Sequence, residues 1–377
     1  MKSKKVILLS NTSWYLYNFK SKLIKNLLKE GYELTLIAPY DKYTELFSKE
    51  ITFKNWELNR RSLNPFKEIL SIYELFLIYK SIQPDYCHHF TIKACIYGTI
   101  ASKICNVKNV LNAHTGLIST ISTLKKIYLL PIRCIFYLIL KILILDGNSV
   151  NIFQNKDDFD QFNKLTGKKI KHSIIIPGSG VDTEFFKLTK SRKISKKKKS
   201  ILFHARLIKE KGLQELILAC KLLWKEGYDF QLNLAGFFDL GNNSSFNKHE
   251  ISNLKSYRNI SFLGHIENIK EVYEESDIVV LPSWREGLSK SLIEAASMEC
   301  SIITTDVPGC KDVIDHGING ILVPVRDVSS LKLAIEFILL NPELSLKFGR
   351  NARKKVLEKF TVSKINEQTM KVYSQFS

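Results

Sequence analysis

Residues 282–324 read PSWREGLSKSLIEAASMECSIITTDVPGCKDVIDHGINGILVP, and they carry the clearest order of predicted secondary structure in the chain. An apolar, strand-like segment ends at Pro282, and Gly287 permits a tight turn before a helical segment begins. A second strand-like segment follows at 301–305. A strand, a helix and another strand in this order indicate a parallel sheet with covering helices.

The same alternation extends back to the N-terminus. We expect strands at 6–10, 33–38, 85–89, 109–113, 201–203, 231–235 and 259–263, and helices at 19–30, 65–81, 91–104 and 213–226. A chain of 377 residues is too long for one ordinary hydrophobic core. We therefore predict an α/β protein with two domains, at 1–186 and 200–360, separated by a basic linker at 187–199.

The formal net charge of +19 is unevenly distributed. It amounts to +11 over residues 1–186, +8 over 187–199 and zero over 200–377. Nucleic acid is not an expected partner, because the chain lacks an interleaved aromatic and basic motif of the RNA-binding kind. An anionic membrane surface or a lipid phosphate fits the excess. The simpler alternative is a lysine-rich surface without a partner.

The most apolar stretch, 127–145, is interrupted by Arg133 and Lys141, so its uncharged runs are too short for a membrane span. It is either a buried helix or an interfacial helix that contacts lipid phosphates through these residues together with Lys125 and Lys126. The N-terminus does not have the pattern of a signal peptide. Seven cysteines without C-x-x-C spacing favour a reducing compartment. We expect a cytoplasmic protein bound peripherally to the inner face of the cell membrane.

Two glutamates flank the turn in the opening stretch. Glu286 precedes Gly287, and Glu294 lies about one and a half turns into the following helix. The amides of Leu288, Ser289 and Lys290 at the helix start are expected to be free, which suits a phosphate. Glu294 can then bind a ribose diol, and Glu286 can bind the sugar that lies beyond the phosphates.

A second group of candidates opens the second domain. Arg206 follows the strand at 201–203, Lys211 lies in the next loop, and Gly212 precedes a helix. Two cations near the carboxyl end of a strand suit a pyrophosphate. Together, the two groups predict a binding site for a nucleotide diphospho-sugar.

These motifs, together with 234–236 (LAG) and 317–324 (GINGILVP), resemble those of family-4 retaining glycosyltransferases of the GT-B fold, over essentially the whole chain. In the first half, 10–14 (SNTSW), 88–93 (HHFTIK) and 115–117 (TGL) are similar to a bacterial branch that builds O-antigen, capsule and related glycans.

The resemblance implies two Rossmann-like domains that face a central cleft, with the acceptor on the first domain and the donor on the second. A C-terminal helix at 361–377 would cross back onto the first domain. The resemblance also implies residue roles: Arg206 and Lys211 bind the diphosphate, Gly287, Leu288 and Ser289 form the phosphate-binding turn, Glu294 binds the ribose, and Glu286 binds the transferred sugar. No cofactor and no metal is expected.

The implied reaction is retaining transfer of a sugar, with N-acetylhexosamine preferred, from a UDP-sugar. The acceptor would be a polyprenyl-diphosphate-linked saccharide or a growing surface polysaccharide. One alternative keeps the fold but makes the protein a UDP-sugar epimerase or a phosphorylase. Another is a non-catalytic, membrane-docked scaffold of a polysaccharide assembly complex, against which the intact set of site residues argues.

Two departures from the family concern the first domain. The loop at 11–15 (NTSWY) replaces a glycine-rich loop, and a family His-Gly pair is out of step by one residue, so that either His114 or Thr115 could serve the acceptor. Three weaker motifs have simpler interpretations. The D-x-D at 158–160 is typical of a helix start, the adjacent histidines at 88–89 should point to opposite faces of a strand, and 177–182 (PGSGVD) should form a turn.

Overall fold

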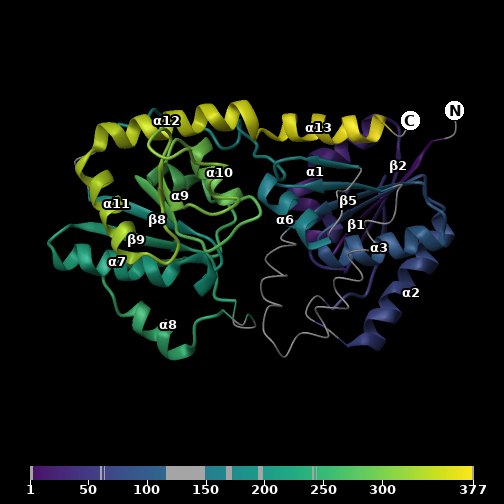
Figure 1. Cartoon of the computed structure of the whole chain (residues 1–377), viewed down its shortest axis with the longest axis horizontal. Coiled ribbons are helices and arrows are strands. Elements are labelled where there is room, and N and C mark those ends of the chain that lie inside the picture. The colour runs from purple at the N-terminus through teal and green to yellow at the C-terminus, as the bar shows by residue number, and fades with distance from the viewer. Residues whose placement is uncertain are drawn as a thin grey trace. The chain divides into compact units, whose positions relative to one another are not determined.

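The computed structural model describes residues 3–59, 62, 64–115, 149–166, 172–193, 198–239, 242 and 244–375. The chain forms two compact units (Figure 1). Unit 1 comprises Met1–Ser179 and Ile365–Ser377, and unit 2 comprises Gly180–Lys364. The apolar stretch at 127–145 with its four basic residues, and Gly116 with Leu117, lie outside the described residues.

The described part of unit 1 contains a seven-stranded sheet in the order β3-β2-β1-β4-β5-β6-β7. All its pairings are parallel. The strands are β1 (Lys5–Ser10), β2 (Glu33–Ala38), β3 (Thr52–Asn55), β4 (Tyr86–Phe90), β5 (Asn109–His114), β6 (Ser149–Phe153) and β7 (Ser173–Ile175). The connecting helices are α1 (Ser13–Lys29), the 3-10 helix η1 (Thr44–Leu46), α2 (Pro65–Ile82), α3 (Ile92–Ile104) and α6 (Lys156–Thr166).

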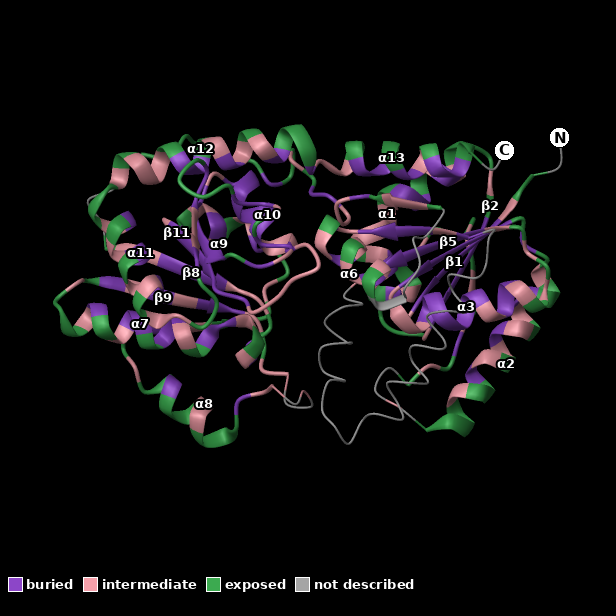
Figure 2. Ribbon diagram, viewed as in Figure 1, coloured by how far each residue is buried: buried purple, intermediate pink, exposed green. Residues whose placement is uncertain are grey.

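Helices cover both faces of this sheet, so the strands β1, β2, β4, β5 and β6 are buried along almost their whole length, whereas the edge strands β3 and β7 are partly exposed (Figure 2). Successive side chains of β1 therefore enter different cores. Ile7 and Leu9 pack in a cluster with α2, α3 and α6, whereas Val6 and Leu8 pack in a cluster with α1. This arrangement explains why the strands read as continuous apolar runs rather than as alternating ones.

Unit 2 repeats the architecture with a six-stranded parallel sheet in the order β10-β9-β8-β11-β12-β13. The strands are β8 (Lys199–His204), β9 (Phe230–Ala235), β10 (Ile260–Gly264), β11 (Ile278–Leu281), β12 (Ser301–Thr305) and β13 (Ile321–Val323). The helices are η3 (Lys209–Lys211), α7 (Leu213–Lys225), α8 (Lys248–Lys255), α9 (Lys270–Glu275), α10 (Lys290–Ser297), α11 (Val328–Leu340) and α12 (Pro342–Lys359). Two parallel-sheet α/β units are what the sequence predicts.

The chain passes into unit 2 after Ser179, earlier than the sequence indicates. Val181 donates its N–H to the carbonyl of Phe360 at 2.9 Å, and the side chain of Phe186 lies in the core of unit 2. The basic segment at 187–193 also belongs to unit 2, because the guanidinium of Arg192 donates to backbone carbonyls, including that of Ser276 at 2.6 Å. High positive charge alone suggested a linker, but this arginine is held against the protein.

The chain returns to unit 1 through α13 (Val362–Ser374). Ile365, Val372 and Tyr373 are buried in the same core cluster as α1. Each fully buried apolar side chain of this size contributes about 1.5–3 kcal/mol. The helix expected at 361–377 therefore completes the core of unit 1. Among the described residues, none of the helices is long and apolar enough to cross a membrane.

Candidate active site

Two loops of unit 2 meet beyond the carboxyl ends of β8 and β11, which are neighbours in the sheet. Gly212 has a φ of +75°, and a Cβ at this position would lie 2.0 Å from the carbonyl oxygen of Pro282. The amide of Trp284 donates to the carbonyl of Glu210 at 2.9 Å. Because of this close approach, the two groups of candidate residues found in the sequence share one site.

Lys211 and Glu286 form an ion pair at the junction of these loops. The ammonium of Lys211 donates to Oε1 of Glu286 at 2.5 Å, and the two side chains are 18% and 12% exposed. The amide of Glu286 donates to the carbonyl of Pro308 at 3.2 Å. Gly309 follows with a φ of +80°, where a Cβ would lie 2.6 Å from the carbonyl oxygen of Glu286. The carboxylate thus has a fixed position beside a cation.

The start of α10 differs from the expectation of free amides. Ser289 is its N-cap residue, and its N–H donates to the carbonyl of Gly309 at 3.4 Å, so this amide is not free. The reason is that the loop after β12 packs against the turn. Leu288 packs against the core of unit 2, and Gly287 lies in the turn between Glu286 and the helix. The sequence spacing places these residues at the turn, but it does not reveal that the loop after β12 packs against them.

Arg206 lies in the loop after β8, and its guanidinium is paired with Asp239 at 3.0 Å, rather than with Glu286. Its side chain is 47% exposed. The carboxylate of Asp239 is only 16% exposed, so the pair is screened by water on the side of the guanidinium alone. The exposed side of the guanidinium is open to an anionic group.

Glu294 is buried within α10, and its described neighbours hold it loosely. The hydroxyl of Tyr273 donates to Oε2 at 3.4 Å, Nδ1 of His204 lies 4.0 Å from the same oxygen, and Nζ of Lys290 lies 3.9 Å from Oε1. The sequence did not indicate His204 or Tyr273 as site residues. His204 could have been suspected, because it is the last residue of β8 and polar strand ends line the sites of parallel sheets.

Burial raises the pKa of Glu294 to about 7, and the nearby charge of Lys290 opposes this shift only in part. Burial lowers the pKa of His204 to about 4, and the charges of His265 and Lys290 lower it further. A carboxylate that is buried, weakly paired and close to ionisation at neutral pH is suited to accept hydrogen bonds from ligand hydroxyls. The site therefore combines cations at one end with a buried carboxylate at the other.

In unit 1, His114 ends β5 and is buried. Its Nε2 lies 2.7 Å from Oδ1 of Asn151. Burial lowers the pKa of His114 to about 4, although the bond to Asn151 acts in the opposite direction. His114 and Thr115 line the same small cavity, so both residues that could serve the acceptor lie at one place. The cavity includes Gly178 of the predicted turn at 177–182.

The remaining motifs have structural roles. Thr12 caps α1 by accepting from the amide of Tyr15, and the amide of Trp14 donates to Asp41 at 3.3 Å, so amides of the segment at 11–15 already have partners within unit 1. Asp158, from the D-x-D at 158–160, lies at the start of α6. Its amide donates to Oδ1 of Asn155 at 2.7 Å, as is usual where a helix begins. In the part of the chain that the structure describes, no group of three or more His, Cys, Asp or Glu side chains is arranged to hold a metal ion.

Comparison with known proteins agrees with this arrangement. The family described as "Glycosyl transferases group 1" matches residues 184–355, and "Glycosyl transferase 4-like" matches residues 5–155. Two parallel-sheet α/β units are the GT-B fold, which the similar solved structures of glycosyltransferases share. The chain belongs to the family-4-like glycosyltransferases of this fold.

Individual relatives are distant but extend over most of the chain. The capsular polysaccharide biosynthesis glycosyltransferase CapM of Staphylococcus aureus is 26% identical, over 84% of this chain and 83% of its own length. The N,N'-diacetylbacillosaminyl-diphospho-undecaprenol alpha-1,3-N-acetylgalactosaminyltransferase of Campylobacter jejuni is 26% identical over 97% of both chains. The structure of Anabaena HepE in complex with UDP and glucose is similar in fold, with a TM-score of 0.76 at 18% identity, over 98% of this chain and 99% of that one.

Proposed function

We propose that this glycosyltransferase transfers a sugar, preferably an N-acetylhexosamine, from a UDP-sugar to a polyprenyl-diphosphate-linked saccharide, with retention of the anomeric configuration. A growing surface polysaccharide is the second acceptor class. The observation that supports this proposal best is the Lys211–Glu286 ion pair, which lies just before the turn that leads into α10. Glu294 is buried within α10, on the other side of this turn. This arrangement matches a diphosphate followed on one side by a sugar and on the other by a ribose.

The charges of the site suggest how transfer would proceed. Lys211 and Arg206 would bind the diphosphate and stabilise the negative charge that develops on it as the sugar leaves. Glu286 would accept hydrogen bonds from the transferred sugar, and Glu294 would accept those of the ribose. Since Lys211 and Arg206 would supply two positive charges to the diphosphate, we propose that transfer requires no divalent metal and no cofactor.

The acceptor class rests on the relatives. The Campylobacter relative is named for an undecaprenol-diphosphate acceptor and an N-acetylgalactosamine donor, and the Staphylococcus relative is named for capsule synthesis. An enzyme with such an acceptor must work at a membrane surface. We therefore propose a cytoplasmic enzyme, peripheral on the inner face of the cell membrane.

The membrane contact we propose is the outer side of α2. Its exposed side chains form an apolar stripe with the spacing of one helix face: Phe66, Ile69, Leu70, Tyr73 and Leu77. Exposed lysines at 67 and 80 accompany the stripe. An apolar helix face with lysines beside it is suited to lie in the interface of an anionic membrane.

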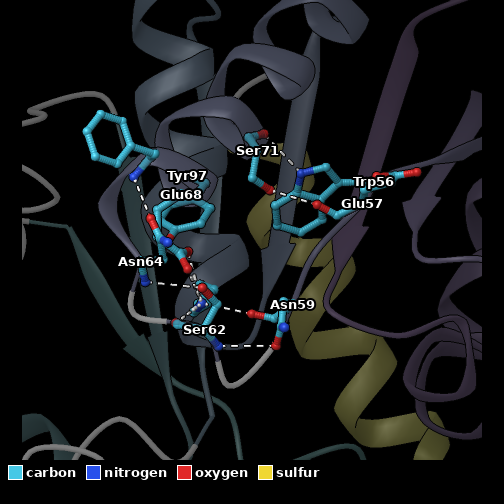
Figure 3. A network of polar contacts seen from close by, with 10 residues as sticks. Trp56, Glu57, Asn59, Ser62, Asn64, Glu68, Ser71 and Tyr97 are labelled. Carbon is cyan, nitrogen blue, oxygen red and sulfur yellow. Dashed lines mark hydrogen bonds and ion pairs between the residues drawn. The ribbon is translucent and has the colours of Figure 1, made fainter.

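The inner side of α2 fixes this orientation (Figure 3). Glu68 is paired with Lys93 of α3 at 2.9 Å and also accepts from the hydroxyl of Tyr97. The indole of Trp56 donates to the carbonyl of Ser71 at 3.0 Å. Lys93 belongs to the HHFTIK motif, so this part of the motif stabilises the packing of α2 rather than the site.

A donor screen tests the proposed reaction. Purified enzyme would be incubated with UDP-sugars and a short-chain polyprenyl-diphosphate-linked N-acetylhexosamine, with and without a chelator, and the products would be examined by mass spectrometry and NMR. We expect one added sugar with retained anomeric configuration, in the chelator as well. An inverted product, a product only with added Mg²⁺ or Mn²⁺, or free epimerised nucleotide sugar would contradict the corresponding part of the proposal.

A further inference from the structure

We propose that Tyr273 is a positioning residue for Glu294, because its hydroxyl holds Oε2 of the carboxylate and stabilises the ionised form that accepts the ribose hydroxyls. This inference rests on the proposed function, in which the nucleotide binds beside Glu294. The side chain of Tyr273 belongs to α9 and is 0% exposed. Tyr273 therefore acts on a donor through Glu294 and not by contact with it.

The hydroxyl of Tyr273 lies among three polar groups from two other elements. Nδ1 of His204, at the end of β8, lies 2.7 Å from it. In α10, the carbonyl oxygen of Ser291 lies 3.0 Å away and Oε2 of Glu294 lies 3.4 Å away. This one hydroxyl thus connects β8, α9 and α10 at the place where the carboxylate is buried.

The position of the hydroxyl oxygen is fixed from the other side of α9. The ring of Phe186 packs edge-on against that of Tyr273, with the centroids 6.3 Å apart. The guanidinium of Arg192 donates to the carbonyl of Tyr273 at 2.5 Å and to that of Ser276 at 2.6 Å. With the ring held in this way, the proton of the hydroxyl is the part that can turn from one acceptor to another.

The protons available to the three groups show which of them donate. The carbonyl of Ser291 and an ionised Glu294 can only accept. Burial raises the pKa of Tyr273 well above its ordinary value of 10.0, so its hydroxyl keeps one proton. Burial lowers the pKa of His204 to about 4, so its ring is neutral at pH 7. Nδ1 of His204 must then carry the ring proton and donate to Tyr273, which leaves the tyrosine proton for Ser291 or Glu294.

The ionisation of Glu294 decides between these two acceptors. A neutral carboxyl leaves the nearer carbonyl of Ser291 as the better acceptor, whereas an ionised carboxylate attracts the proton more strongly, because charge-assisted hydrogen bonds are stronger than neutral ones. Burial raises the pKa of Glu294, and the charge of Lys290 and the bond from Tyr273 lower it. The hydroxyl thus favours the form of Glu294 that can bind a ribose.

The other titratable groups around Glu294 come from its own helix and from the strand ends. Nζ of Lys290 lies 3.9 Å from Oε1, and Nδ1 of His204 lies 4.0 Å from Oε2. His265, which follows β10, acts on His204 and lowers its pKa. All three groups are retained in Tyr273→Phe, so a difference between this variant and the wild type reports the hydroxyl alone.

A titration without ligand tests the role of Tyr273 directly. In protein labelled with ¹³C-glutamate, the carboxyl signal of Glu294 is identified by its absence in Glu294→Gln. We expect a midpoint near pH 7 in the wild type. In Tyr273→Phe the midpoint should be higher by about one pH unit, the usual effect of losing one hydrogen bond to a charged group. In wild type labelled with ¹⁵N-histidine, the proton of the neutral His204 ring should lie on Nδ1.

Calorimetric titration with UDP provides the functional measurement. A midpoint one unit higher leaves less ionised Glu294, so Tyr273→Phe should bind UDP about 5-fold more weakly than the wild type at pH 7. By pH 9, where the carboxylate is ionised in both proteins, the two Kd values should agree within about 2-fold. A purely structural defect would weaken binding equally at every pH.

The matched control is Tyr228→Phe, which removes a tyrosine hydroxyl that donates to Glu336 at 2.6 Å elsewhere in unit 2. It should change neither the midpoint of Glu294 nor the Kd of UDP. An unchanged midpoint in Tyr273→Phe, an equal shift in Tyr228→Phe, or a ring proton on Nε2 of His204 would overturn the role of Tyr273. Absence of UDP binding in the wild type would instead refute the donor site of the proposed function, and the ligand-free midpoints would still decide the role of Tyr273.

Discussion

At the scale of single residues, Lys211 and Glu286 neutralise each other where water is largely excluded. A buried pair of this kind is costly to break on one side only, since the remaining charge is left without a partner. In the proposed function, ligand binding resolves this problem, because a diphosphate would take over Lys211 while sugar hydroxyls would take over Glu286. We therefore propose that the pair exchanges its internal contact for contacts with a donor.

We predict that Lys211→Ala and Glu286→Ala each lower kcat/KM by at least about 100-fold, the usual cost of removing one group that stabilises developing charge. The double variant Lys211→Ala/Glu286→Ala should fold better than either single variant, because it leaves no unpaired charge. Steady-state kinetics and circular dichroism would measure the two effects. Lys209→Ala is the matched control, since it breaks the more exposed pair with Glu250 at 2.8 Å. Near wild-type turnover in the Lys211 or Glu286 variants would contradict the assignment.

Glu294 should make donor binding dependent on pH. Its pKa of about 7 lies above its ordinary value of 4.5, so its protonation stabilises the fold below pH 4.5, and this contribution of about 3 kcal/mol is lost as pH rises through 7. Ribose hydroxyls donate to the ionised form. UDP should therefore bind more tightly as pH rises from 6 to 8.

Isothermal titration calorimetry of the wild type and of Glu294→Gln checks this expectation. The variant should bind UDP more weakly at pH 8 and lose most of the pH dependence, and the wild type should lose more unfolding free energy than the variant between pH 5 and 8. Equal pH profiles for the two proteins would show that Glu294 does not titrate in this range.

At the scale of elements, the position of Glu286 depends on the loop after β12. Gly309→Ala places a Cβ about 2.6 Å from the carbonyl oxygen of Glu286, at a φ of +80° that disfavours any side chain. We predict at least a 10-fold loss of kcat with a modest loss of stability. Gly227→Ala is the matched control, because it introduces a side chain at a positive φ (+94°) without a close contact. It therefore separates backbone strain from displacement of Glu286. Thermal unfolding should show destabilisation in both variants, larger for Gly309→Ala because of the added contact, and kinetics should show loss of activity in Gly309→Ala alone.

At the scale of the whole molecule, the net charge of +19 and the apolar stripe on α2 predict reversible binding to anionic membranes. Each basic residue near such a surface contributes about 1 kcal/mol, and the attraction fades within a Debye length. The triple variant Phe66→Ser/Leu70→Ser/Tyr73→Ser should sediment less with anionic vesicles and lose activity on lipid-linked acceptors, while it still binds UDP.

A second triple variant controls for exposed apolar area in general. Leu333, Phe337 and Leu340 are exposed on α11 of unit 2, and their replacement by serine should leave vesicle binding unchanged. High salt should release the wild type from the vesicles. Wild-type sedimentation of the α2 variant would show that the membrane contact lies elsewhere.

The sequence alone determined the alternation of strands and helices in both units, because apolar runs and turn residues are local signals. It also placed Lys211 and Glu286 in loops that follow strands, where parallel sheets carry their sites, and Glu294 in the helix that follows Glu286. Element ends were less certain: α1 begins at Ser13 and not at 19, because Thr12 caps it. Charge was a poor guide at 187–193, where Arg192 is bound to backbone carbonyls of unit 2.

Only the tertiary structure decided which distant residues meet. Gly309 supports Glu286 because β12 lies beside β11, and His204 approaches Glu294 because β8 lies on the other side of β11. Tyr373 reaches His88 because α13 returns to unit 1 after the whole of unit 2. Such contacts depend on the order of strands in a sheet and on where the chain returns. Local periodicity encodes neither, since these arise from burying each element against partners far away in the sequence.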